Sequence, residues 1–86
     1  MSNDTLTQAE YSRLKSRLTF RQNKLKAAKK SGDTAGVKHS ARQVISEVHY
    51  AFGIFQSKGY PDQWANWERA KEDAELAERL SGGGGL

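Results

Sequence analysis

The 86-residue sequence contains no cysteine, a single proline and no long apolar run. Without cysteine the chain forms no disulfide, no thiolate metal site and no thiol nucleophile. No stretch approaches the roughly 20 consecutive apolar residues that a membrane-spanning helix needs. The polar, acidic residues 1–4 lack the apolar run of a secretory signal. We therefore expect a cytoplasmic protein that has no membrane partner.

Residue sets that carry catalysis or bind cofactors are also missing. His39 and His49 lie on one expected helix, about 15 Å apart in height at a rise of 1.5 Å per residue, so they cannot share a metal ion. Glu47, His49 and nearby serines form a trio of a kind that any helical protein offers. The glycines at 82–85 follow the last expected helix and precede nothing, unlike a phosphate-binding loop. We expect no enzymatic activity, no catalytic residue, no metal and no cofactor.

The charge is unevenly distributed along the chain. The formal net charge is +4, but residues 8–30 carry eight lysines and arginines against the single acid Glu10. Residues 62–80 carry six acidic and three basic side chains, a net charge of −3. The sequence is thus basic in its N-terminal part and acidic in its C-terminal part.

The strongest helical pattern lies between residues 34 and 58. Apolar residues recur there at alternating steps of four and three, which is the spacing of one face of an α-helix. Ile45 and Phe52 widen this stripe, which predicts a central helix with neighbours on more than one side. Gly36 and Gly53 indicate close packing against a neighbouring helix, with a bend at Gly53 as the alternative. The stripe consists of Val37, Ala41, Val44, Val48, Ala51 and Phe55.

The first helix, expected at residues 8–30, has a sharp start signal. Thr7 and Glu10 match a capping box, and Leu6 and Tyr11 occupy the two positions of a hydrophobic staple. Its narrow apolar seam predicts one partner helix, and Arg21 occupies a seam position. Gly32 suits the left-handed conformation after the helix end. The seam residues are Tyr11, Leu14, Leu18, Arg21, Leu25 and Ala28.

A third helix is expected at residues 62–80. Gly59 and Pro61 end the preceding helix, and Tyr60 is predicted to lie over Phe55 as in a Schellman ending. The apolar stripe of this helix has large side chains in its N-terminal part and only alanines after them. We therefore expect its N-terminal part to pack firmly against the other helices. The stripe consists of Trp64, Trp67, Ala70, Ala74 and Ala77. Residues 1–6 are expected to form a flexible arm and residues 81–86 a glycine-rich flexible tail.

These patterns predict an all-α fold, a small three-helix bundle with helices at about 8–30, 34–58 and 62–80. A compact monomer is the first architecture. The alternative is a homodimer in which a hairpin of the first two helices pairs through its seams and the third helix lies across it. Residues 7–80 form a single domain in either case.

Basic and apolar residues away from the seams are the candidate partner-binding residues. Phe20 points away from the first seam, among cations, and Tyr50 and Ile54 lie off the central stripe. Exposed apolar groups in excess indicate an interface. The other reading of the basic flank is that it pairs with the acidic third helix. The candidates are Arg13, Arg17, Phe20, Arg21, Lys24, Tyr50 and Ile54.

Two functions are compatible with this pattern. The first is a non-enzymatic protein-interaction module of the small adaptor or inhibitor kind, which binds an acidic or mixed partner surface through the basic helix. On the basis of its small size alone, we associate such a module with phages or mobile elements. The alternative is a nucleic-acid-binding protein that contacts phosphates through Arg13, Arg17, Arg21 and Lys24. The first is preferred because the acidic third helix would repel a nucleic acid that wraps the bundle.

Overall fold

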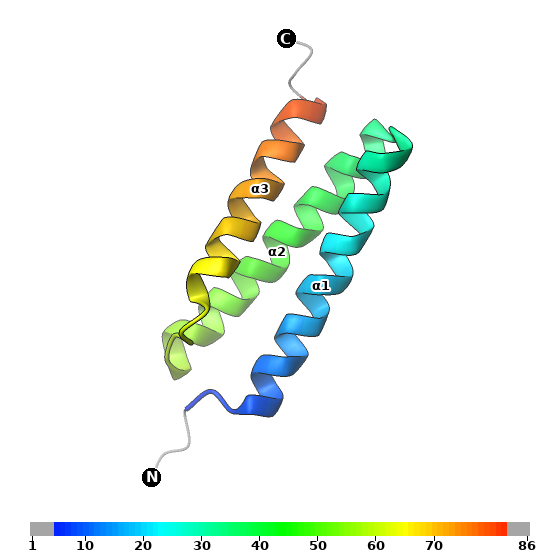
Figure 1. Ribbon diagram of the computed structural model, residues 1–86. Coiled ribbons are helices and arrows are strands. Elements are labelled where there is room, and N and C mark those ends of the chain that lie inside the picture. Colours follow the sequence, from blue (N-terminus) through cyan, green and yellow to red (C-terminus); the bar gives the residue numbers. More distant parts are fainter. Residues whose placement is uncertain (1–4, 83–86) are drawn as a thin grey trace.

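The computed structural model describes residues 5–82 and contains three helices, α1 (Gln8–Ser31), α2 (Thr34–Lys58) and α3 (Trp64–Gly82) (Figure 1). No strand occurs within this range. Residues 1–4 and 83–86, with most of the expected arm and tail, lie outside the described residues. The predicted all-α three-helix bundle is confirmed.

The helix α2 is the centre of the bundle. It packs against both α1 and α3, whereas no Cα atom of α1 lies within 8 Å of a Cα atom of α3 in the described chain. All six residues of its predicted stripe are buried, from Val37 to Phe55. The seam leucines that a hairpin dimer would use, Leu14, Leu18 and Leu25, are buried within the single chain.

Both ends of α1 follow the predicted cap signals. The Thr7 amide donates to the Glu10 carboxylate (3.0 Å), and the Glu10 amide donates to the Thr7 hydroxyl (3.1 Å), which completes the capping box. Leu6 packs against the core beside this cap. At the other end, Gly32 has a φ of 73° and its amide donates to the Lys29 carbonyl (3.2 Å). The amide of the next residue bonds the Ala28 carbonyl (3.1 Å), so α1 closes with a full Schellman motif.

The connection from α2 to α3 differs in detail from the prediction. The Tyr60 ring lies 5.6 Å from the Phe55 ring, as expected. However, Gly59 has φ 109° and ψ 140°, which is not the left-handed helical conformation, so the ending is not a Schellman motif. The Trp64 amide bonds the Pro61 carbonyl (3.1 Å) in a turn. For this reason α3 starts at Trp64, two residues later than predicted, and it continues to Gly82.

An aromatic cluster joins the three helices at one end. The Trp67 ring lies 5.5 Å from Phe55 and 6.0 Å from Tyr11, both edge-on. The Trp67 indole N–H also donates to the Tyr11 hydroxyl (3.2 Å). Behind Trp67, α3 buries only the alanines 70, 74 and 77. The predicted stripe is thus confirmed from Trp67 to Ala77, whereas Trp64, its first predicted member, is 43% exposed and stays outside the core.

Gly53 faces open space, with no atom within 4 Å of the position a Cβ would occupy. This finding overturns the expected close packing at Gly53. At Gly36, a Cβ would meet the side chain of the cap residue Asp33 rather than a neighbouring helix. Neither glycine therefore marks a close helix contact.

Gly53→Ala is expected to raise the free energy of unfolding by about 1 kcal/mol, because alanine loses less backbone entropy in an exposed helix interior. Urea unfolding followed by circular dichroism measures the change. Gly59→Ala is the matched control and should lower stability, since φ at Gly59 is positive. A loss of stability in Gly53→Ala would show that this glycine serves a contact or a bend after all.

The Glu10 carboxylate accepts hydrogen bonds from the Lys58 amine and the Thr7 amide, which lower its pKa from 4.5 to about 2. A depressed pKa contributes stability above the ordinary value, and this contribution is lost as the pH falls towards about 2. Wild type should therefore be more stable than Glu10→Gln at pH 7, and the two should converge near pH 2. Urea unfolding across this range tests the expectation. A difference that stays constant with pH, or that is not reduced in a Lys58→Met background, would contradict it.

Candidate partner-binding surface

The seven candidate residues lie along one furrow between α1 and α2. Three hollows follow one another there, and no residue of α3 lines any of them. We call this surface the α1–α2 furrow. Arg17 lines both the first hollow, beside Tyr50, and the middle hollow, beside Glu47. Phe20 lines both the middle hollow and the third, beside Lys24. The structure therefore brings together Arg13, Arg17, Phe20, Arg21, Lys24, Tyr50 and Ile54.

Cations lie over the two aromatic rings of the furrow. The Arg21 guanidinium is 5.8 Å and the Lys24 amine 5.1 Å from the Phe20 ring centroid. The Arg17 guanidinium is 5.3 Å from the Tyr50 ring centroid. Both rings are 54% exposed, so much of each remains open to a partner. Such contacts hold the long basic side chains against the protein surface.

Glu47 is a member of this surface that the sequence reasoning did not select. It is only 7% exposed, and its carboxylate lies 3.2 Å from Arg17 Nε and 3.4 Å from Arg21 Nε. A buried carboxylate requires such partners. The available signal was Arg21 itself, because an arginine in an apolar seam calls for an acid on the facing helix.

Ile54 is the least exposed of the three apolar candidate residues. It is half-buried and packs against the core, and its remaining surface lines a hollow with Arg13 and Tyr50. Ile54 therefore forms part of the furrow floor, whereas Phe20 and Tyr50 project from it.

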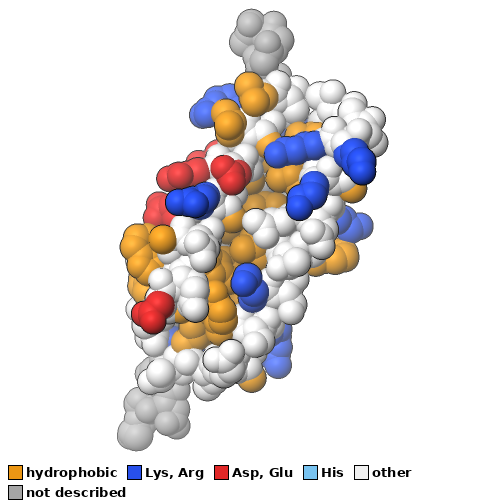
Figure 2. All heavy atoms as spheres, viewed as in Figure 1, with side chains coloured by type: hydrophobic (Ala, Val, Ile, Leu, Met, Phe, Trp, Pro, Cys, Tyr) orange, Lys and Arg blue, Asp and Glu red, His pale blue; other side chains and the backbone are white. Residues whose placement is uncertain are grey.

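The basic α1 does not pair with the acidic α3. Within residues 5–82, the ion pairs of α1 all go to α2: Arg17 and Arg21 to Glu47, and Glu10 to Lys58. Figure 2 shows acidic side chains gathered over α3 and mostly basic ones over α1, with hydrophobic groups between them. This arrangement overturns the expected alternative in which α3 neutralises the basic flank.

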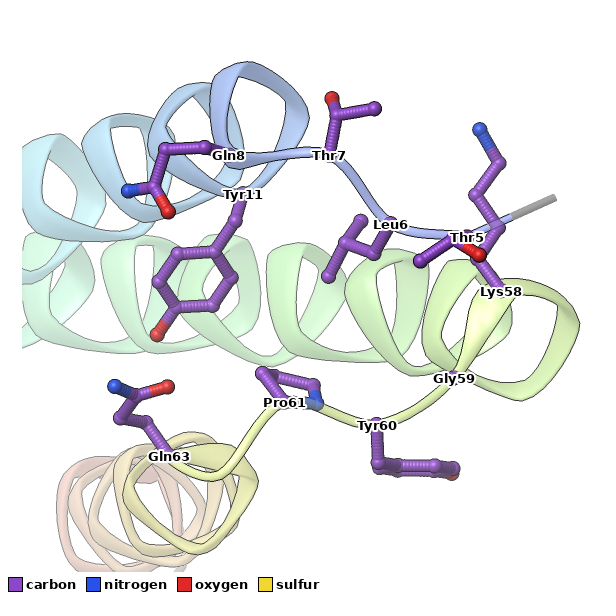
Figure 3. A pocket seen from close by; sticks show the side chains of 10 residues that line it. All are labelled: Thr5, Leu6, Thr7, Gln8, Tyr11, Lys58, Gly59, Tyr60, Pro61 and Gln63. Carbon is purple, nitrogen blue, oxygen red and sulfur yellow. The ribbon is translucent and has the colours of Figure 1, made fainter. Parts of the chain in front are cut away.

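A separate hollow of about 370 Å³ lies at the end of the bundle, between the N-terminal segment, the end of α2 and the turn into α3 (Figure 3). Tyr11 and Lys58 line it, but both already bond within the protein, to Trp67 and Glu10 respectively. The other lining residues include no acid and no histidine. This hollow offers no recognisable chemistry.

No group of three or more histidine or acidic side chains within residues 5–82 is arranged to hold a metal ion. His39 and His49 are both exposed. Among the helices of the same range, none has the length and apolarity required to cross a membrane.

Comparisons with family models, curated proteins and solved structures give no match to this chain.

Proposed function

We propose that this chain is a non-enzymatic protein-interaction module of the small adaptor or inhibitor kind, acting in the cytoplasm. It binds an acidic or mixed surface of a partner protein through the α1–α2 furrow. One observation carries the proposal: the furrow combines two half-exposed aromatic rings with four cations of α1 and the buried acid Glu47.

The composition of the furrow is that of an interface core. Aromatic residues and arginine are enriched among the side chains that dominate binding energy. Arg17 and Arg21 are held from below by Glu47, so they lose less conformational freedom when a partner binds. The clustered positive charge also speeds the encounter with an acidic surface.

Capture experiments test this function. The tagged wild-type protein and a Phe20→Ala/Tyr50→Ala variant are incubated with extract of the native cells, and the retained proteins are compared. Leu76→Ala is the matched control, since Leu76 is an exposed apolar residue of α3 outside the furrow. We expect a protein that wild type and Leu76→Ala retain equally and the furrow variant retains at least about tenfold less. If no retained protein depends on the furrow, the proposal fails.

Nucleic-acid binding is the second candidate, and one observation favours it. No residue of the acidic α3 lines the furrow. A nucleic acid bound there is therefore repelled less by α3 than one that wraps the whole bundle. Arg13, Arg17, Arg21 and Lys24 would contact phosphates, and bases would stack on Phe20 or Tyr50.

The salt dependence of oligonucleotide binding separates the two candidates. If four cations neutralise four phosphates of a single strand, log K should fall against log salt with a slope of about −3. Fluorescence anisotropy at two or more salt concentrations measures this slope, with Arg13→Glu/Lys24→Glu as the variant. Under the protein-partner proposal, binding is weak at physiological salt and the variant changes little there. Tight binding that the variant abolishes would instead establish the second candidate.

A further inference from the structure

We propose that the occupant of the α1–α2 furrow is an acidic amphipathic helix of the partner, which lies along α1 and α2 as a fourth helix of the bundle. This inference rests on the proposed function and specifies the shape and chemistry of the partner. The length of the furrow, its net charge and its arrangement of apolar and charged groups each support this proposal.

The furrow has the length of a helix. Its three hollows have volumes of about 270, 230 and 630 Å³ and join at Arg17 and Phe20. Along α1 they extend from Glu10 to Ser31, which is about 32 Å at 1.5 Å per residue, or about six helical turns. Helices pack at interaxial distances of about 8–10 Å, so a third rod can rest between two that already touch.

Every carboxylate that lines the furrow is already bonded within the protein. Glu47 binds Arg17 and Arg21, and Glu10 binds Lys58. The Asp33 carboxylate accepts from the Gly36 amide as the cap of α2. The lining nevertheless carries five cations against these three carboxylates, and Arg13 and Lys24 make no ion pair within residues 5–82. A partner that brings its own acids complements this remaining positive charge.

The rim and the floor of the furrow differ in chemistry. Phe20, Tyr50 and Ile54 offer apolar surface, and the cations stand beside them along the α1 side. The complementary ligand has an apolar stripe with acids on its flank, which is the pattern of an acidic amphipathic helix. An extended peptide fits less well, since residues 5–82 form no sheet whose edge could bond its backbone.

A designed helix serves as the probe. A synthetic peptide of about 20 residues, with leucine at the apolar positions and glutamate on the flanks, is titrated into the full chain and followed by amide chemical shifts. Two matched peptides carry lysine for glutamate, or serine for leucine. We expect the leucine–glutamate helix to bind, with shifts along both α1 and α2, and both matched peptides to bind at least about tenfold more weakly.

Two charge reversals locate the site on one side of α1. Arg13→Glu/Lys24→Glu lies in the furrow and should weaken binding of the leucine–glutamate helix at least about tenfold. Lys26→Glu/Lys29→Glu changes the net charge equally, but neither residue lines the furrow, so binding should persist. Both variants change exposed residues and should remain folded.

Three results would overturn the helix proposal. In the first, the serine–glutamate peptide binds as well as the leucine–glutamate helix, which would show attraction of any polyanion. In the second, a single-stranded oligonucleotide binds more tightly and displaces the helix. In the third, no shift occurs in the furrow. If furrow-dependent capture of a native protein persists in the third case, only the helix proposal fails. If capture is also lost, the proposed function fails with it.

Discussion

Trp67→Ala is expected to remove about 3–5 kcal/mol of the free energy of unfolding, as large-to-small changes of buried aromatic residues do. Trp67 is only 1% exposed, contacts Phe55 and Tyr11 edge-on, and donates its indole N–H to the Tyr11 hydroxyl. A scaffold of this size has a total stability of only about 3–5 kcal/mol. The variant should therefore be largely unfolded at 25 °C.

The neighbouring tryptophan provides the control for this prediction. Trp64 is 43% exposed and lies 6.0 Å from Tyr60 at the edge of the same aromatic cluster. Trp64→Ala should therefore lower stability by about 1 kcal/mol or less. Urea unfolding followed by far-ultraviolet circular dichroism compares the two variants. Equal losses for Trp64→Ala and Trp67→Ala would contradict the position of Trp67 as the residue that joins all three helices.

Arg21→Glu is expected to remove about 2–3 kcal/mol, because it places a second carboxylate beside the buried Glu47. Arg21 lies 3.4 Å from Glu47 through Nε. The expected loss is below the 3–5 kcal/mol that is typical of a broken buried pair. The reason is that the Arg21 side chain is 33% exposed and Arg17 stays in place.

Thermal and urea unfolding test this prediction. Arg13→Glu is the matched control and should change stability by less than about 0.5 kcal/mol, because Arg13 is exposed and makes no ion pair within residues 5–82. In a Glu47→Gln background, Arg21→Glu should lose less than in wild type, since the like-charge repulsion is gone. Unchanged melting of Arg21→Glu would contradict the register in which α1 faces α2.

Features set by local residues could be predicted from the sequence. The capping box at Thr7, the glycine after α1 and the stripe of α2 depend on neighbours within one or two helical turns, and the structure confirms each of them. Features that depend on the backbone geometry between helices could be predicted less well. The turn at Pro61 delays α3, and the conformation of Gly59 depends on where α3 docks rather than on the residues around it.

The candidate surface depends on which flank of α1 faces α3. Both flanks of α1 carry cations, so charge alone does not decide between them. The packing decides between them. Lys29 lines a hollow with Ala77 of α3, so its flank faces α3, whereas Arg17 on the other flank pairs with Glu47 of α2. Which flank of α1 faces α3 is determined by the packing of the core, and helical periodicity in the sequence does not encode it.

The acid Glu47 illustrates the same limit. Helical spacing places it beside the stripe of α2, but only the packing of α1 against α2 shows that it lies between two arginines. Once that pair is known, the two arginines become anchored groups of the furrow rather than a solvated basic face.

Site-specific photocrosslinking in the native cells tests most directly the claim that the α1–α2 furrow is where this chain binds a protein. A photoreactive phenylalanine analogue replaces Phe20, and a matched variant carries it at Leu76 on α3. We predict an adduct at position 20 that protease removes and nuclease does not, with no such adduct at position 76. An adduct that nuclease removes, or equal adducts at both positions, would contradict it.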